Sequence, residues 1–222
     1  MTDAGWLALW VAVLGTGLAA IVVLHRLGLR STYARDLLHI GTGVWVLGWP
    51  AWSRPHLPVA LVCLAFAATA WVPVASRRMA VAAQLEQSVT SGDERWVGLV
   101  WYTFAYALGT WVGLAYAVFP AAAALLALSL GDGIGGAVGR RFGRLRYRVP
   151  WSKPKSLEGS LAVAAMAAAG AALASVWLGV PVGAGGVIAI GIASAVAEAL
   201  APRGTDNIVV PAAAFGVAMW VL

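Results

Sequence analysis

The sequence predicts an all-α, polytopic bundle of membrane-spanning helices. The chain has 222 residues, of which 61% are hydrophobic and only 11% are charged. Its mean hydropathy of +0.84 is far above that of an ordinary soluble domain. Apolar runs recur along the chain at about the 20 residues that a helix needs to cross a hydrocarbon core of roughly 30 Å. Cations gather in alternate connections between these runs, as the positive-inside rule describes for membrane proteins.

We predict about eight spans, with seven as the alternative because two of the runs are short. Pro50 ends the second run early, and the last run, residues 208–222, has only 15 residues. No internal repeat or linker divides the chain, so residues 1–222 are predicted to form a single integral domain. The expected ranges are 4–24, 37–52, 57–75, 96–119, 121–138, 159–178, 182–200 and 208–222.

The positions of the cations predict the orientation. With the N-terminus outside, eight spans place every cation except Arg54 on one face, which is then the cytoplasmic face. We therefore expect a multi-pass protein of the cell (cytoplasmic) membrane with cytoplasmic active-site loops. Nucleic acid is not an expected partner, because this asymmetry accounts for the pI near 10.1. Cys63 is the only cysteine, so a metal would be held by oxygen or nitrogen ligands.

The lipid bilayer is an expected partner of these spans. Five carboxylates fall at the predicted cytoplasmic ends of the spans. An ionisable group in such a place needs a partner or a function. Because the ends of several spans meet in a bundle, we expect these side chains to form one polar pocket. They are Asp36, Asp132, Glu158, Glu198 and Asp206.

Asp132 stands within a glycine-rich segment, with Gly131 before it and Gly135 and Gly139 after it. Glycine lets backbone N–H groups approach an anion closely, and a carboxylate can hold a divalent cation. This pattern favours a nucleotide phosphate site with Mg²⁺. The alternative is a helix interface made by Gly135 and Gly139. A GxGxxG match in the same segment carries little weight because no strand precedes it, and the chain has no Walker A motif.

A basic loop follows, and its two halves differ in composition. The first half is rich in arginine and could bind anionic lipid headgroups instead of a nucleotide. The second half holds the only two lysines of the chain, Lys153 and Lys155, just before Ser156 and a predicted helix start near Gly159. A helix N-terminus beside ammonium groups suits phosphates. Glu158 is either a charge of the first helical turn or a ligand acting through Mg²⁺.

Polar residues near both ends of the chain complete the candidate set. His39 lies one helical turn from Arg35 and could deprotonate an alcohol or bind phosphate, although a lone histidine often has only a hydrogen-bonding role. Asp206 and Asn207 open the last span, where capping of that helix is the alternative to a ligand role. Glu198 stands one turn beyond Ser194 in an apolar run.

At these residues the chain resembles the membrane-bound polyprenol kinase family, which includes phytol, farnesol and dolichol kinases. The family's nucleotide motif reads approximately DxxAxxxGxxxG, then a basic residue, then KSxxGSxA. Two further elements, RKxxHxxxG and DNxxxP, flank it. Three departures are present: Gly135 replaces an alanine, Asp36 replaces the lysine after Arg35, and glycine follows His39 at both Gly41 and Gly43. The matching residues are Arg35, His39 and Gly43; Asp132, Gly139, Gly143, Arg146, Lys155, Ser156, Gly159, Ser160 and Ala162; and Asp206, Asn207 and Pro211.

The resemblance implies Mg²⁺-assisted transfer of the terminal phosphoryl group of CTP to the hydroxyl of an isoprenoid alcohol such as phytol, geranylgeraniol, farnesol or a polyprenol. It implies catalytic roles for Asp132, His39 and Lys155, and Mg²⁺ ligands in Asp132 and Asp206. The expected contacts to the alcohol substrate are Arg35, His39, Glu198 and Asn207. The expected nucleotide contacts are Gly131, Gly135, Gly139, Arg140, Gly143, Arg146, Lys153, Lys155, Ser156, Glu158 and Gly159.

Three other functions fit parts of the pattern. A cytidylyltransferase of the CDP-diacylglycerol synthase kind carries a similar arrangement of glycine, aspartate and lysine, although no lysine follows Lys155 here. A CTP-dependent diacylglycerol kinase would use the same donor. A small membrane transporter would explain polar helix ends, but it would place its pathway residues near the middle of the bilayer.

Overall fold

The structure is a computed structural model that describes residues 1–90, 96–152, 154–202 and 204–222. Within this part the chain is helical apart from one short antiparallel hairpin of two-residue strands, in which Arg146 pairs with Ser156 and Tyr147 with Lys155. The elements are α1 (Asp3–Arg26), α2 (Ser31–Thr42), α3 (Val44–Leu47), η1 (Trp49–Ala51), α4 (His56–Ala75), α5 (Ala80–Val89), α6 (Val97–Ala115), α7 (Val118–Leu126), η2 (Ala127–Asp132), α8 (Gly133–Phe142), β1 (Arg146–Tyr147), β2 (Lys155–Ser156), α9 (Leu157–Leu178), α10 (Ala184–Leu200) and α11 (Asp206–Trp220).

The predicted all-α class is confirmed, and the long apolar helices support the predicted membrane character. Five helical segments of the described chain are long and apolar enough to cross a membrane: α1, α4, α6, the run from Val118 to Phe142, and α9. The helices α10 and α11 are apolar but shorter. A count of eight spans, and the orientation, therefore stay predictions.

The second predicted span, residues 37–52, is wrong as one continuous helix. It is divided into α2, α3 and η1, with breaks at Gly43 and Gly48. Both glycines are in close contact with other elements: a Cβ added at Gly43 would lie 2.8 Å from Ser129 Oγ, and one added at Gly48 would lie 2.6 Å from Trp10 Cζ2. Pro50 then supplies no backbone N–H to continue an α-helix. The short helix α5 was also not predicted, since it lies between the expected spans 57–75 and 96–119.

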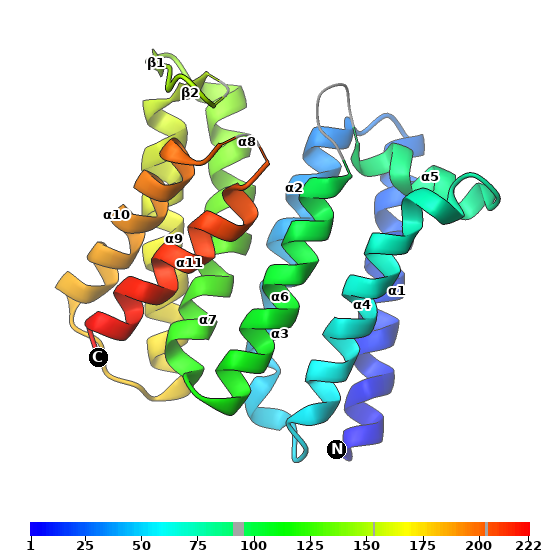
Figure 1. Cartoon of the computed structure of the whole chain (residues 1–222), viewed down its shortest axis with the longest axis horizontal. Coiled ribbons are helices and arrows are strands. Elements are labelled where there is room, and N and C mark those ends of the chain that lie inside the picture. Colours follow the sequence, from blue (N-terminus) through cyan, green and yellow to red (C-terminus); the bar gives the residue numbers. More distant parts are fainter. Residues whose placement is uncertain (91–95, 153, 203) are drawn as a thin grey trace.

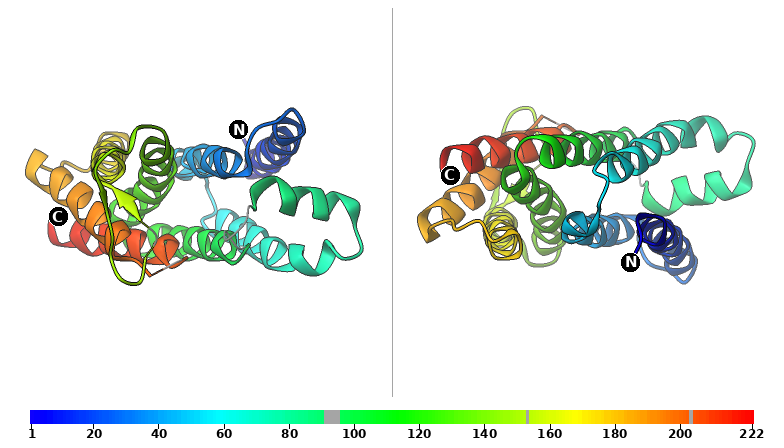
Figure 2. Two further views of the ribbon diagram at one scale, coloured as in Figure 1. Left: turned by 90° about the horizontal axis from the view of Figure 1, so that it is seen from above. Right: turned by 90° about the horizontal axis from the view of Figure 1, so that it is seen from below.

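The helices form two rows when the bundle is viewed along its spans (Figure 2). One row contains α9, the α7–α8 run, α2 with α3, and α1, while the other contains α10, α11, α6 and α4. The α7–α8 run is central, because 67% of its most apolar stretch is buried, compared with 11% in α1 and in α4. Residues Phe119 to Leu128 of this run are all buried, so the core lies around it.

One end of the bundle collects the polar connections. The first turns of α2, α6, α9 and α11 and the last turns of α1, α4, α8 and α10 all lie at this end, together with the β-hairpin (upper part of Figure 1). We call it the hairpin end. The connection through Arg54 and the N-terminus lie at the opposite end (Figure 1). The chain reverses direction at the hairpin end between α1 and α2 through Gly28, whose φ of +100° favours glycine.

Candidate functional site

Asp132 lies at the hairpin end, where the central helix changes its winding. It is the last residue of η2, a π-helical turn between α7 and α8. Such turns inside α-helices are often found at functional sites because they redirect side chains. The Asp132 carboxylate Oδ2 lies 3.0 Å from Nδ1 of His39, and its side chain is 20% exposed, whereas that of His39 is 3% exposed. The two predicted catalytic residues therefore form a pair that is open on the Asp132 side.

His39 is fixed by α6 as well as by Asp132. Its imidazole stacks on the ring of Tyr102, with centroids 4.0 Å apart and an angle of 16° between the planes. Its backbone carbonyl accepts hydrogen bonds from the Tyr102 hydroxyl at 3.2 Å and the Thr42 hydroxyl at 2.8 Å. Since an ionised carboxylate only accepts hydrogen bonds, Nδ1 of His39 carries the proton toward Asp132. In the neutral ring Nε2 then carries the lone pair, and this buried atom has no hydrogen-bond partner in the described chain.

Charged side chains from four segments, α2, β2, α10 and α11, converge around this pair. Lys155 of β2 forms an ion pair with the Glu198 carboxylate of α10, and its Nζ also donates to the Glu198 backbone carbonyl at 2.6 Å. Asp206, at the start of α11, interacts electrostatically with Asp132, Lys155 and Arg35. We call Asp132, Glu198 and Asp206 the carboxylate cluster. The structure therefore brings together residues that are up to 171 positions apart, from Arg35 to Asp206.

Asn207 fastens α11 to α6. Its side-chain Nδ2 donates to the backbone carbonyl of Gly98 at 2.8 Å, while its buried Oδ1 has no partner in the described chain. The Asp206 carboxylate accepts a hydrogen bond from the Asn207 backbone N–H at 3.1 Å. Thr205 precedes the helix without a capping side-chain hydrogen bond. Asn207 therefore does not cap α11, and its contact with α6 fixes the start of α11, where Asp206 of the carboxylate cluster stands.

The predicted nucleotide-binding glycines face α9. A Cβ added at Gly135 would lie 2.3 Å from Val163 Cγ2, and one added at Gly131 would lie 3.5 Å from the same side chain's Cγ1. Added Cβ atoms at Gly139 and Gly143 would lie 3.1 Å and 2.6 Å from Ser156 Oγ. These glycines form the close α8–α9 interface that was the alternative to direct phosphate contact.

Gly159 belongs to the same interface, since its added Cβ would lie 3.1 Å from the Cα of Gly139. The side chain of Ser156 caps α9 by accepting a hydrogen bond from the Gly159 backbone N–H at 3.2 Å. Glu158, in the first turn, accepts from the backbone N–H of Leu145 at 3.2 and 3.3 Å. These contacts hold the loop after α8 against the start of α9.

The hairpin is also fixed at its tip. Indole Nε1 of Trp151 donates to the backbone carbonyl of Leu200 at 2.6 Å, which ties the loop to the last residue of α10. Tyr147 and Ser160 share a hydroxyl hydrogen bond of 2.6 Å. Arg146 is exposed on β1. Lys153, the other predicted phosphate-binding lysine, lies outside the described residues.

Arg140 is bound to a carboxylate of another helix. It forms an ion pair with Asp36 of α2, and its guanidinium lies 5.4 Å from the ring centroid of Tyr33. Asp36 stands where the resembled family carries lysine. Its negative charge is explained by the ion pair with Arg140. Gly133 lets the two helices approach, because an added Cβ would lie 2.8 Å from Ile40 Cγ1.

Four polar residues near the site were not predicted as part of it: Thr42, Tyr102, Tyr106 and Thr110. Tyr102, Tyr106 and Thr110 are spaced four residues apart in an otherwise apolar run, so they fall on one face of α6. This spacing was the available signal. All three are buried, with exposed fractions of 6% or less.

The described residues contain no group of three or more His, Cys, Asp or Glu side chains arranged to hold a metal ion. Two carboxylates, Asp132 and Asp206, nevertheless come close enough to repel each other electrostatically. Magnesium in proteins is commonly held by one or two carboxylates together with substrate phosphates. The residues therefore fit a Mg²⁺ ion that arrives with a nucleotide better than a site formed by the protein alone.

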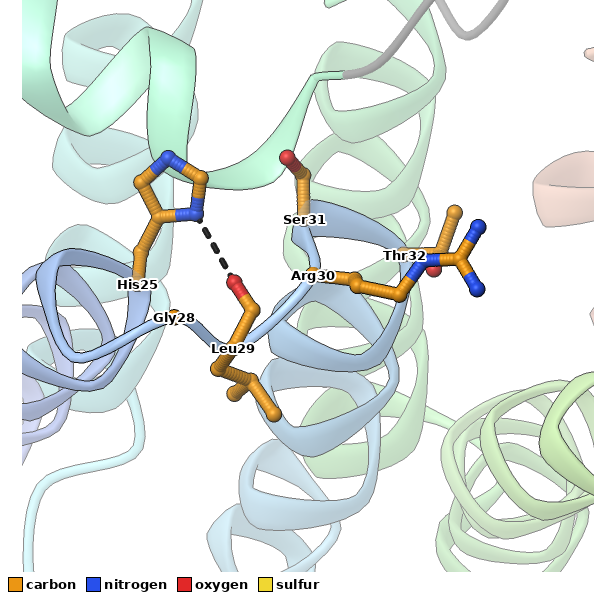
Figure 3. Close-up of a pocket in the computed structure, with 6 residues that line it drawn as sticks. All are labelled: His25, Gly28, Leu29, Arg30, Ser31 and Thr32. Carbon is orange, nitrogen blue, oxygen red and sulfur yellow. Dashed lines mark hydrogen bonds between the residues drawn. The ribbon is translucent and has the colours of Figure 1, made fainter.

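A surface depression of about 370 Å³ lies at the turn between α1 and α2 (Figure 3). Its lining residues come from the segment between His25 and Thr32 and include none of the predicted site residues. His25 Nδ1 lies 3.0 Å from the backbone carbonyl of Leu29, while the Arg30 side chain points away from His25 (Figure 3). This depression is therefore separate from the carboxylate cluster.

Comparison of the chain with protein-family models, with curated proteins and with solved structures finds no match in any of the three. The functional argument rests on the residues gathered at the hairpin end.

Proposed function

We propose that this protein is a CTP-dependent, Mg²⁺-assisted kinase that phosphorylates the hydroxyl of a membrane isoprenoid alcohol. The observation that carries the proposal is the Asp132–His39 pair, which is open on the Asp132 side and interacts electrostatically with Lys155 and Asp206. Three sequence elements that resemble the polyprenol kinase family supply these residues. Their meeting at one end of an apolar bundle supports a common site.

His39 is the proposed group that orients the acceptor alcohol and takes its proton. Asp132 holds Nδ1, so the Nε2 lone pair is available to a hydroxyl donor. The stack on Tyr102 and the two hydrogen bonds to the His39 carbonyl restrict movement of the imidazole. Such positioning is a main source of catalysis in phosphoryl transfer, because the protein needs to do little covalent chemistry.

Lys155 is the proposed cationic contact to the triphosphate. Its ammonium group is held by Glu198 of α10 and lies just before α9, whose N-terminal end attracts anions. Three carboxylates surround this lysine, and they would repel a triphosphate that came without a cation. Bound Mg²⁺ would supply that charge neutralisation, with Asp132 and Asp206 as its protein ligands. This charge balance supports a metal–nucleotide complex as the donor.

A labelling experiment tests the reaction. Purified protein is incubated with Mg²⁺, a panel of isoprenoid alcohols and CTP labelled separately at its α- or γ-phosphate. We expect γ-label in the lipid and release of CDP. Entry of α-label only when a lipid phosphate is supplied, with release of pyrophosphate, would indicate a cytidylyltransferase instead. Diacylglycerol in place of the isoprenoid alcohols tests the other CTP-dependent kinase, and no label in any lipid would refute the proposal.

A further inference from the structure

The short helix α2 carries His39, so its position against α8 decides whether His39 meets Asp132. It lies beside the α7–α8 run in one row of helices (Figure 2). Of its 12 residues, three are buried: Ala34, Asp36 and His39. A methyl group such as that of Ala34 makes no directional contact, whereas hydrogen-bonded polar groups require a defined geometry. The buried face of α2 therefore depends on its two polar side chains for a defined position.

Asp36 binds Arg140 of α8 at this face. A guanidinium nitrogen of Arg140 donates to the Asp36 carboxylate, and the Asp36 side chain is only 9% exposed. The Arg140 side chain runs back along α8 over Gly136, since a Cβ added at Gly136 would lie 3.1 Å from Arg140 Nη1 and 3.7 Å from Asp36 Oδ1. The glycine at this position therefore leaves the space through which the guanidinium reaches α2.

The Asp36–Arg140 and His39–Asp132 pairs lie on the same helix interface. Asp36 precedes His39 by one turn of α2, and Arg140 follows Asp132 by about two turns of α8. Gly133 brings the two backbones together beside these pairs, because an added Cβ would lie 3.2 Å from the Asp36 carbonyl oxygen and 3.3 Å from His39 Cβ. Helix α2 is therefore attached to the central run by two polar pairs with a close backbone contact.

Two attachments restrict a helix more than one does. With the His39–Asp132 contact alone, α2 could rotate about that contact or tilt against α8. The ion pair opposes such a movement, because separating the partners would leave the buried Asp36 carboxylate without its cation. Fixing the register of packed helices is the best-attested use of buried charged or polar groups.

We propose that Asp36 and Arg140 are positioning residues, whose ion pair holds α2 in the register at which His39 meets Asp132. The inference rests on the proposed function, in which His39 orients the acceptor alcohol. It gives Arg140 a role in turnover instead of a contact with the nucleotide. Misplacing reacting groups by about 1 Å can lower a rate by about a hundredfold, so the loss of the pair should be visible in kcat.

Arg140→Met separates positioning from phosphate contact, since methionine keeps an unbranched apolar side chain but has no N–H donor. We expect kcat for transfer from CTP to fall about a hundredfold, with a KM for CTP within about twofold of the wild-type value. A direct phosphate contact would instead raise this KM. An unchanged kcat, with or without a raised KM, would overturn the proposal.

Arg141→Met is the matched control. It removes the same charge from the same turn of α8, but Arg141 is exposed and its guanidinium lies 5.9 Å from the ring centroid of Phe142. Its kcat should equal that of the wild type. An equal fall in kcat for Arg141→Met and Arg140→Met would mean that the loss of any nearby cation has this effect, and it would refute a specific role of the pair.

Exchange of the two residues, Asp36→Arg with Arg140→Asp, separates the contact from the charges. The double variant restores an ion pair across the interface with both charges reversed, whereas Asp36→Arg alone places two cations opposite each other. We expect the double variant to recover kcat to within about tenfold of the wild-type value. A folded double variant no more active than Asp36→Arg would contradict the proposal. If either Arg140→Met or the double variant fails to fold, as measured by thermal unfolding, the other decides.

A measurement without nucleotide or alcohol keeps this inference separate from the kinase assay. The chain has three histidines, so solid-state NMR of ¹⁵N-histidine protein in lipid bilayers gives few imidazole signals, and His39→Gln identifies those of His39. We expect the hydrogen-bonded Nδ1–H signal of His39 in the wild type and in Arg141→Met, and its loss in Arg140→Met. An unchanged His39 spectrum in Arg140→Met would overturn the proposal. If the wild type transfers no label but Arg140→Met loses this signal, the kinase proposal fails and the positioning of His39 stands.

Discussion

Gly135→Ala tests whether the glycine-rich segment is needed for helix packing. The added Cβ would lie 2.3 Å from Val163 Cγ2, 3.2 Å from the Gly159 carbonyl oxygen and 3.3 Å from the Val163 backbone nitrogen. Rotation of Val163 could relieve the first contact, but a valine in a helix has one strongly preferred rotamer. The two backbone contacts would remain. Helices α8 and α9 would therefore have to separate.

We expect this overpacking to destabilise the protein by about 1–3 kcal/mol, the usual effect of an extra methyl group in a closely packed interface. For a chain of this size, that corresponds to a fall in Tm of about 2–12 °C. Thermal unfolding in lipid nanodiscs without nucleotide measures the effect on packing alone.

Gly185→Ala is the matched control. Gly185 also lies in a helix, but an added Cβ there would meet nothing within 4 Å. Its Tm should stay close to that of the wild type, as expected for an exposed substitution. If Gly135→Ala unfolded at the same temperature as Gly185→Ala, the close α8–α9 packing argument would be refuted. A Gly135→Ala protein of unchanged stability that no longer binds CTP would favour direct phosphate contact at this glycine.

Three further predictions concern the site and its surroundings. Asp132→Asn and Lys155→Ala should each abolish phosphoryl transfer while membrane insertion, measured by extraction from washed membranes, stays intact; near-normal turnover in both would remove the proposed site. The Asp36–Arg140 ion pair should give a coupling free energy of about 1–2 kcal/mol in a double-mutant cycle of unfolding with alanine at both positions, whereas additive effects would show that the pair contributes nothing. Excess EDTA should stop label transfer from CTP, and added Mg²⁺ should restore it; turnover that persists under EDTA would exclude the metal-assisted reaction.

Part of the site followed directly from the sequence. Asp132, Lys155 and Asp206 are rare charges at the ends of apolar runs, and a charge in that place needs a partner. The alternation of spans then required their ends to meet at one end of the bundle. The resemblance named the same residues from motif order alone. Their grouping could therefore be predicted, because the order of the spans along the chain places these residues at the same end of the bundle.

The roles of other predicted site residues depended on which side chain of a neighbouring helix they contact. The sequence alone does not show these contacts. The sequence predicts a phosphate contact for Arg140, and only the structure shows that Arg140 pairs with Asp36 across the α2–α8 interface. For Gly135 and Gly139 the sequence allowed either phosphate contact or a helix interface. The short distances from an added Cβ to Val163 and Ser156 show that both glycines lie in a closely packed interface. A short contact of this kind depends on the rotation of two helices about their axes.

What the sequence by itself determined is the apolar, all-helical character of the chain and the placing of its charges at helix ends, because composition and the positions of polar residues fix how each segment meets lipid and water. Only the tertiary structure decided that the second span is interrupted and that His39 is held by Tyr102 and Asp132. It also placed the buried Thr110 hydroxyl of α6 against the indole of Trp45 in α3. These features come from packing between helices distant in sequence, where the close approach of glycine and the shape of aromatic rings select one arrangement.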